Sequence, residues 1–520
     1  MKSWLKWYKK LTSNKDSNQQ NQSSNQSSSN QRDTPKNTEP RHKETIELSA
    51  DYKEAFYTNK NTGKTFILTL FKSISDEKVI EDFVLPPLLG QEFKSIEDVS
   101  SLLPIPDVEI TDDLSSRDEK LLNGYAEIKM KDDLSKACYV AVNRNEGRSI
   151  TQPEIEYSVI GPKESFVESL EININLLRKR LPVKDLVVLE KRVGTYSKTR
   201  VAVVYIKGLA DEENINTIEQ RLEDMKYDNI IDSSFVEQII SDQHNSPFPL
   251  ALDTERPDRT AAVLTEGKVV MIVDGSPHAL IAPTTLVEFF NSFDDYLTNW
   301  MLASFFRLLR LFSVAFSILI TPIYVAALSY HYELIPGDLL GTLVASRQKI
   351  PLPPILEAIF LELTIELLRE AGARLPTKVG QTIGIVGGIV IGTASVEAGL
   401  TSNVLLIIVA LAALASFTTP VYKIGNAIRV LRFPFLIFAE ILGLLGIVYC
   451  FCILMAYTLN LTSLGRPFLE PLFPPRFTDF RDALIRLPFR NQKQRPMYTR
   501  PYKPTRFRKK EKKKSKDIDE

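Results

Sequence analysis

The chain has 520 residues and a formal net charge of zero, because 64 lysines and arginines balance 64 aspartates and glutamates. This balance argues neither for nor against nucleic acid, and we expect no nucleic-acid partner. The cysteines (Cys138, Cys450 and Cys452) make no disulfide framework and, with four scattered histidines, no metal set. No P-loop, zinc signature or Ser-His-Asp order stands out, so we expect no cofactor and no enzymatic activity.

The first 300 residues have the composition of a water-soluble region. Residues 1–44 are rich in asparagine, glutamine and serine, and such a segment buries too little apolar surface to fold, so we expect a disordered leader. Residues 45–149 have an α/β pattern and are predicted as a first small subdomain. Its predicted strands are Thr65–Lys72 and Ala137–Val142, and its predicted helices are Asp76–Phe83 and Lys94–Leu102.

Residues 150–300 are predicted as a second α/β subdomain, with helices against a small sheet. Its periodicities predict helices at Lys163–Arg180, Asn214–Met225 and Asp232–Ile240, and a hairpin of Asp185–Lys191 and Arg200–Lys207. A β-rich block follows, directly before the apolar half of the chain. Glu266-Gly267 is a two-residue hairpin signal that predicts strands at Thr260–Thr265 and Lys268–Asp274, followed by Ala279–Ala282.

Residues 301–460 are predicted as an α-helical multi-pass membrane domain. Roughly 20 apolar residues cross a bilayer as a helix. Four segments qualify as spans: Leu311–Tyr330, Gln381–Thr401, Val404–Tyr422 and Phe433–Thr458. Pro322 and Pro420 are expected to kink their helices.

Residues 461–520 are predicted as a basic cytosolic tail, since Arg490 to Lys516 contains thirteen lysines and arginines and one acid. The positive-inside rule places this tail and the soluble region in the cytosol, which requires an even number of crossings. Four crossings satisfy that requirement. One conflict with the positive-inside rule remains, because four crossings place the cations Lys423, Arg429 and Arg432 on the outer side.

The segment Pro354–Glu370 is apolar but carries Glu362, Glu366 and Glu370 at helical i, i+4 spacing. Three carboxylates argue against a lipid-embedded span and favour a helix on the membrane surface or along water. The stripe could attract cations if several copies surround a pore mouth, or it could be a solvated helix face.

Two further acids, Glu397 and Glu440, lie within apolar segments. A carboxylate is costly in a membrane, so each is expected to face protein or water. Glu440 is the stronger candidate for a buried polar contact or a cation site, because Glu397 lies near a predicted helix end.

A glycine ladder is the most unusual feature of the apolar half. It consists of Gly380, Gly384, Gly388 and Gly392, which share one face of a helix. Small residues on one face allow another helix to approach closely, so the ladder fits either a helix interface or a pore helix repeated around an axis. The pore interpretation adds an apolar constriction from Ile385, Val386, Ile389 and Val390, beside Thr393.

Two acids and two arginines lie within six residues of the second subdomain: Glu255, Arg256, Asp258 and Arg259. This cluster fits an ion-pair clasp between domains or a simple polar loop.

The chain resembles the A subunit of the GerA-type nutrient receptors, which trigger germination of endospores in Bacillus-like bacteria. The resemblance covers about residues 50–490. It is carried by Gly161–Phe166, Phe248-Pro249, Thr254–Arg259, Val273–Pro277, Asp294–Tyr296, Tyr324–Leu328, Arg369–Gly372, Arg374–Pro376, the glycine ladder and Glu397–Gly399.

The resemblance implies a multi-pass protein of the inner spore membrane, with a two-part N-terminal domain in the spore core. It implies a transporter-like B subunit that holds the nutrient and a lipoprotein C subunit as partners. It also implies that copies of the chain assemble, as a pentamer, into a nutrient-gated cation channel. The alternatives are a transporter-like subunit, or a scaffold subunit without a pore of its own.

Overall fold

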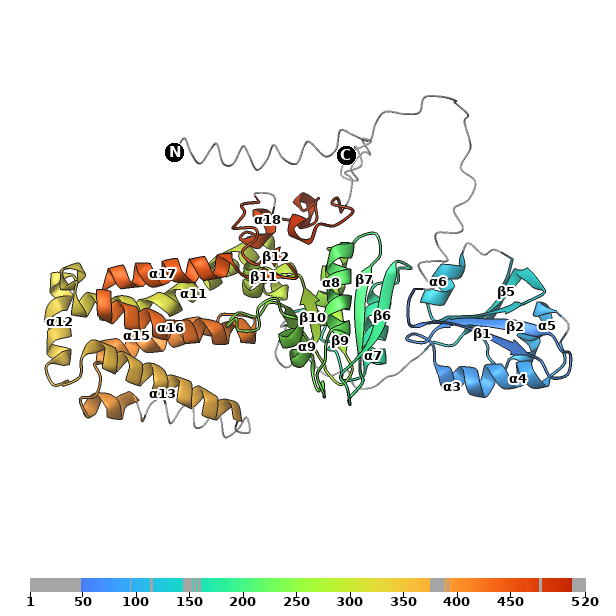
Figure 1. Ribbon diagram of the computed structural model, residues 1–520, viewed down its shortest axis with the longest axis horizontal. Coiled ribbons are helices and arrows are strands. Elements are labelled where there is room, and N and C mark those ends of the chain that lie inside the picture. The colour runs from blue at the N-terminus through green and yellow to red at the C-terminus, as the bar shows by residue number, and fades with distance from the viewer. Residues whose placement is uncertain are drawn as a thin grey trace, which may run out of the picture. The chain divides into compact units, whose positions relative to one another are not determined.

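The computed structural model describes residues 48–93, 95–112, 116–143, 153, 156, 160–374, 388, 390, 392–476 and 479–506. The predicted leader, residues 1–44, lies outside the described residues. Figure 1 shows the two β-sheets with their helices and the group of long helices that follows them in the chain.

The first subdomain is an antiparallel sheet in the order β1-β2-β4-β5-β3. Its strands are β1 (Tyr52–Thr58), β2 (Thr65–Phe71), β3 (Val108–Thr111), β4 (Tyr125–Met130) and β5 (Asp133–Ala141). Its helices are α3 (Glu77–Val79), η1 (Ile80–Val84), α4 (Leu85–Gly90), α5 (Ile96–Leu102) and α6 (Arg117–Leu122). The Asp76 side chain accepts from the Lys78 N–H and so begins α3. All four predicted elements are confirmed, although their ends differ by a few residues.

The second subdomain is an antiparallel sheet in the order β6-β7-β9-β10-β8. Its strands are β6 (Leu186–Val193), β7 (Thr199–Ile206), β8 (Leu252–Thr254), β9 (Val269–Val273) and β10 (Ala279–Ala282), and its helices are α7 (Leu170–Arg180), α8 (Glu212–Glu223), α9 (Ser233–Ile240) and α10 (Pro257–Thr265). Alternate strand residues point to opposite faces. Thus Val188 and Val204 pack with α7, whereas Val187 and Val203 pack with α8 and α9.

The predicted hairpin at Glu266-Gly267 is wrong, because Thr260–Thr265 belongs to α10. Pro257 at the helix start fixes a helical φ, and Gly267 follows the helix end with φ +92°. The Gly267 N–H donates to Leu264 O and the Lys268 N–H to Val263 O, which closes the last turn. The glycine therefore ends a helix rather than making a hairpin turn.

A buried arginine joins the two subdomains. Arg178 of α7 is 1 % exposed, and its Nε and Nη2 atoms donate to the two carboxylate oxygens of Asp51 over 2.9 and 2.8 Å. Ser49 and Ser73 each donate to the same carboxylate over 2.6 Å. The guanidinium also lies 4.6 Å from the centre of the Phe71 ring. The sequence analysis missed this network, whose partners are 127 residues apart.

The apolar half folds into helices that pack on one another. They are α11 (Trp300–Ser329), α12 (Gly337–Arg347), α13 (Pro354–Arg374), α15 (Asn403–Ser416), α16 (Tyr422–Leu442) and α17 (Leu444–Leu459). Among the described residues, α11 alone is long and apolar enough to cross a membrane by itself, while α15 and α17 are apolar but shorter.

Two predicted spans differ from the observed helices. The segment Phe433–Thr458 is divided between α16 and α17, because the chain turns at Gly443 with φ +62°. The segment Val404–Tyr422 ends early as α15, and Pro420 lies in the turn before α16 rather than in a kinked helix. In the predicted span Gln381–Thr401, residues 381–387, 389 and 391 lie outside the described residues. Leu311–Tyr330 falls almost entirely within α11, which includes Pro322.

Part of the predicted tail belongs to the fold. Residues 461–506 include β11 (Thr462–Ser463), β12 (Arg466–Pro467), α18 (Phe480–Ala483), η6 (Phe489–Asn491) and η7 (Met497–Thr499). Leu461 and Phe468 are fully buried in the core of the second subdomain. The lysine-rich end, residues 507–520, lies outside the described residues.

Candidate functional site

The glycine ladder lies partly outside the described residues. The positions not described are Gly380, Gly384, Ile385, Val386 and Ile389. The positions described are Gly388, Val390, Gly392 and Thr393, and residues 392–397 are helical. The structure therefore describes the C-terminal end of the ladder.

The described end of the ladder has one packed side and one open side. A Cβ atom added to Gly392 would lie 3.7 Å from a methyl group of Leu406 in α15. A Cβ atom added to Gly388 would meet no described residue within 4 Å. Val390 is 55 % exposed, and the side chain of Thr393 is exposed too. In a single chain, an apolar and small-residue surface is therefore left uncovered beside the ladder.

Contacts at the helix ends show that α11 and α16 run in the same direction. Helix α11 directly follows the second subdomain, and α16 begins beside it, since Lys423 Nζ lies 3.2 Å from the Asp253 carboxylate. At the other end of both helices, Ser329 Oγ donates to Glu440 over 3.3 Å. Both helices therefore lead away from the soluble region.

Three other helices run in the opposite direction. Helix α13 begins beside the start of α15, where the Ser402 N–H donates to Glu357 over 3.1 Å, and ends beside the start of α16, where Arg369 donates to Asn426 over 3.2 Å. Helix α17 ends at Leu459, and Leu461, two residues later, is buried in the core of the second subdomain. The end of α13 and the start of α15 therefore lie at opposite ends of the helix group.

Among the described helices, α11 and α16 therefore run in one direction and α13, α15 and α17 in the other, where the sequence analysis expected four spans. Because α16 begins at the soluble region, Lys423 lies on that side. The sequence analysis put Lys423 on the outer side because it did not count α13 among the segments that precede this residue.

Helix α13 packs one face against the helix group, with Glu357, Ala358, Leu361 and Glu362 buried. Glu362 and Arg432 of α16 are each 2 % exposed and lie 2.7 Å apart. Thr321 Oγ1 of α11 donates to the same carboxylate over 3.2 Å, and Arg432 Nη2 donates to Ala412 O of α15 over 3.3 Å. This buried ion pair therefore connects four helices.

The other two acids of the stripe also lie beside arginines. Glu366 is 2.7 Å from Arg369 and 3.5 Å from Arg429, and Glu370 is 2.7 Å from Arg374. Two of the partners, Arg429 and Arg432, come from a helix some 60 residues later, so helical spacing within α13 did not indicate them. The role of these acids in attracting cations stays a prediction.

The two remaining acids of the apolar half have different surroundings. Glu397 is exposed, at the end of the described ladder helix. Glu440 is half-buried and accepts the hydrogen bond from Ser329. A role for either acid in a cation path also stays a prediction.

The predicted clasp ties the start of α10 to the segment before α11. Arg256 is 2 % exposed, and its guanidinium donates twice to Asp258, over 3.1 and 2.8 Å. The same group lies 3.7 Å from the Asp294 carboxylate and 5.1 Å from the centre of the Phe293 ring. Both of these residues belong to η4 (Phe293–Tyr296).

The other two clasp residues connect the start of α10 to the chain before α7. Arg259 forms an ion pair with Glu156, and the Phe166 N–H donates to Glu255 O over 2.7 Å. The cluster therefore joins parts of the second subdomain, and the proposed contact between domains stays a prediction.

The start of α16 is built into the second subdomain. Ile424 and Ile428 are buried in the same core as α7. Lys423 forms ion pairs with Glu237 and Asp253. Burial raises the pKa of Glu237, and the Lys423 ammonium offsets only part of that rise. The sequence analysis missed this contact, because Lys423 and Glu237 are 186 residues apart.

The described residues contain no group of three or more histidine, cysteine, aspartate or glutamate side chains that is arranged to hold a metal ion. Cys138 is buried, which raises its pKa to about 12, so its thiol stays protonated and unreactive at neutral pH.

Comparisons with known proteins agree with one another. A family model described as Bacillus/Clostridium GerA spore germination protein matches residues 41–498. Spore germination protein GerQA of Bacillus cereus is 50% identical over 456 residues, which cover 88% of this chain and 91% of that protein. Spore germination protein GerIA of the same species is 46% identical over 458 residues, covering 88% and 68%. Spore germination protein A1 of Bacillus subtilis (strain 168) is 38% identical over 432 residues, covering 83% and 89%.

One solved structure is also similar. The crystal structure of the N-terminal domain of the A subunit of the Bacillus megaterium spore germinant receptor GerK3 aligns with a TM-score of 0.35 and 26% identity. The alignment covers 46% of this chain and 91% of that one.

Proposed function

The chain belongs to the GerA family of spore germination proteins, and we propose that it forms a germinant-gated cation channel as the A subunit of a nutrient receptor. In this proposal several copies, five in a ring, assemble in the inner spore membrane. A transporter-like B subunit binds the nutrient, and a lipoprotein C subunit completes the receptor. Both ends of the helical region face the spore core.

The observation that carries the proposal is the open side of the ladder helix. Gly392 packs on α15, whereas Val390 is exposed and no residue in the described part of the chain lies within 4 Å of a Cβ atom added to Gly388. A second copy of the chain can cover this face closely, because a glycine surface lets helices approach. Val390 then lies beside a shared axis, where a ring of apolar side chains excludes water and closes the path to ions.

Helix α16 provides a physical link between the soluble region and this helix. Its start is buried in the second subdomain, and Arg432 holds Glu362 of α13. Helix α13 directly precedes the ladder segment. Germinant binding opens the channel only to the extent that it favours the open arrangement over the closed one. A shift of α16 is the proposed route by which that preference reaches the ladder.

Potassium flux from liposomes that contain the purified full-length chain tests the channel proposal. Val390→Asn places a polar group in the proposed constriction, and we expect it to increase basal flux about tenfold or more, because a polar ring wets more readily. Val430→Asn is the matched control, since Val430 is 62 % exposed and belongs to a different helix, α16. Equal flux from both variants and the parent contradicts a pore at this helix.

One observation favours the second candidate, a scaffold subunit without its own pore. Each acid of the α13 stripe already lies beside an arginine, which neutralises charge that a cation pathway would use. A scaffold predicts no flux from any of these liposomes, while the chain still binds its partner subunits.

A further inference from the structure

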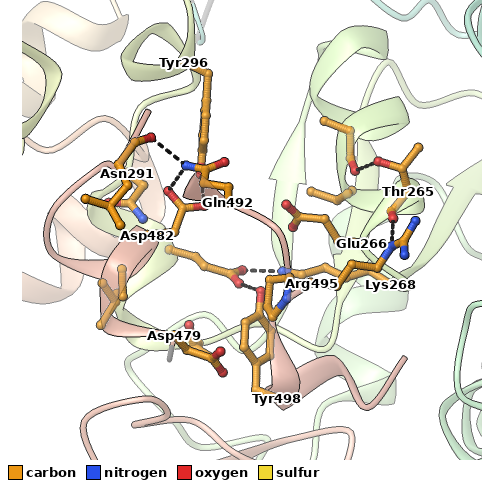
Figure 2. A pocket seen from close by; sticks show the side chains of 18 of the residues that line it. Thr265, Glu266, Lys268, Asn291, Tyr296, Asp479, Asp482, Gln492, Arg495 and Tyr498 are labelled. Carbon is orange, nitrogen blue, oxygen red and sulfur yellow. Dashed lines mark hydrogen bonds and ion pairs between the residues drawn. The ribbon is translucent and has the colours of Figure 1, made fainter. Parts of the chain in front are cut away.

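A cavity of about 780 Å³ lies between the second subdomain and the C-terminal segment. Figure 2 shows that its walls come from the end of α10, from the chain between β10 and α11, and from residues 479–498. Its volume is typical of pockets that enclose a small organic molecule. The channel proposal assigns it no role.

The lining of this cavity has an apolar part and a charged part. Its apolar side chains include Leu252, Val263, Val287, Leu297 and Leu487. Its charged side chains are five cations and four acids: Arg259, Lys268, Lys493, Arg495 and Arg506, with Glu266, Glu288, Asp479 and Asp482. A molecule with one charged group and an apolar body would match both parts.

The charges of Lys268 and Glu288 are satisfied within the protein. Lys268 is 1 % exposed and its Nζ lies 2.5 Å from Glu288 Oε2. The Tyr498 hydroxyl donates to the other carboxylate oxygen, and the Lys268 ammonium lies 5.3 Å from the centre of the Tyr498 ring. The charges of Lys268 and Glu288 therefore need no ligand to neutralise them.

Of Arg495 and Arg506, in contrast, only Arg506 forms an ion pair with a described carboxylate. Arg506 Nη2 lies 2.5 Å from Glu266 Oε1, while its Nε is buried and has no hydrogen-bond partner among the described residues. Arg495 forms no ion pair with a described carboxylate. Its Nε donates to Thr265 O over 2.7 Å, and its Nη1 donates to two further backbone carbonyls over 2.8 Å.

The surroundings of Arg495 are therefore short of negative charge. Burial lowers its pKa, and the nearby Arg506 lowers it further, whereas Glu266 compensates only in part. A bound anion would relieve both the repulsion between the guanidinium groups and the unmet Arg506 donor. Guanidinium groups bind carboxylates well, because their donors match the two oxygens.

We propose that this cavity binds a small organic monoanion, with its carboxylate beside Arg495 and Arg506 and its apolar body against Leu487 and the neighbouring aliphatic side chains. The ligand ties the C-terminal segment to α10 and to the segment that leads into α11. This inference goes beyond the channel proposal and does not depend on it.

Three probes of similar shape test the charge requirement: benzoate, benzyl alcohol and benzylammonium. Each is titrated against the full-length chain in detergent while its thermal unfolding is followed. We expect benzoate to bind at least about tenfold more tightly than benzyl alcohol, and benzylammonium to bind least. Equal binding of all three, or no binding of any, overturns the proposal.

Variants locate the site. Arg495→Gln is expected to weaken benzoate binding about tenfold, whereas Arg490→Gln, which changes an exposed arginine outside the cavity lining, leaves it unchanged. Leu487→Trp fills the apolar part of the cavity and keeps both arginines, so it is also expected to weaken benzoate binding. This second variant provides the test if Arg495→Gln fails to fold. Unchanged benzoate affinity in Leu487→Trp overturns the assignment. No ion flux is needed, so a failure here is distinguishable from a failure of the channel proposal.

Discussion

At the scale of single residues, the chain is notable for its buried arginines, which form ion pairs inside the protein. Four of its largest fully buried side chains are Arg178, Arg256, Arg307 and Arg432. Arg178, Arg307 and Arg432 pair with carboxylates from other elements: Asp51, Asp295 and Glu362, respectively. Arg256 pairs with Asp258 in the same turn and also lies 3.7 Å from Asp294 of η4. A buried pair contributes little net stability, but removing one partner leaves an uncompensated charge. Each arginine therefore fixes where two segments meet.

The junction of the two soluble subdomains gives the clearest test of this idea. Arg178→Met leaves Asp51 buried without its cation, and we expect the free energy of unfolding to fall by about 3–5 kcal/mol at neutral pH. Denaturant unfolding of the full-length chain measures it. Arg180→Met, on the same helix, removes the partly exposed pair with Glu164 and should cost at most about 1 kcal/mol. Equal losses would contradict the account.

The same pair predicts a pH dependence. Burial alone would raise the pKa of Asp51, but Arg178 and the two serines hold it below its ordinary value. A carboxyl with a lowered pKa contributes stability that is present above its unfolded pKa, about 4, and is lost as pH falls through the lower folded value. The deficit of Arg178→Met should therefore shrink in acid. A deficit that stays constant down to strongly acidic pH would argue against this origin.

The Glu362–Arg432 pair can be tested by a double-mutant cycle. Arg432→Met alone leaves a buried carboxylate and should destabilise the chain by about 3–5 kcal/mol, measured by unfolding in detergent. Adding Glu362→Met removes that charge and should recover much of the loss. Additive losses in the double variant would show that the two side chains do not act as a pair.

At the scale of helices and strands, the turn between α16 and α17 determines how many segments cross the helix group. Gly446 permits this turn, because a Cβ atom there would lie 1.9 Å from the backbone oxygen of Phe438. Gly446→Ala should therefore cost about 1–3 kcal/mol and lower the melting temperature of the full-length chain. Gly425→Ala, in α16, is the control, because its nearest contact is an ordinary 3.6 Å. Equal melting temperatures for the two variants would contradict a close approach between Gly446 and the Phe438 backbone.

The sequence predicted most elements of both subdomains, because their apolar residues repeat with the period of a helix or a strand. It failed where one glycine allows two interpretations. Gly267 ends α10 instead of making a hairpin turn, and Gly443 divides an apolar run that is long enough for one span. It also missed contacts such as Lys423–Glu237, because the periodicity within one element does not indicate a partner far along the chain.

At the scale of the whole molecule, α16 connects the second subdomain, α13 and, through α13, the ladder segment. The start of this helix lies in the core of the second subdomain, and its middle pairs with α13, which precedes the glycine ladder. The soluble region and the helices are therefore in mechanical contact within one chain. The four predicted spans differ from the described helices in two places, because they left out α13 and the turn at Gly443.

The central claim is that copies of the chain bring the open face of the ladder helix together. Disulfide cross-linking of Val390→Cys in membranes tests it most directly, in a Cys452→Ser background because Cys452 is exposed. Val430→Cys, equally exposed on α16, is the control. The account predicts cross-linked dimers of the full-length chain for Val390→Cys and few for Val430→Cys. A Val390→Cys chain that stays uncross-linked, or that links no better than Val430→Cys, would contradict it.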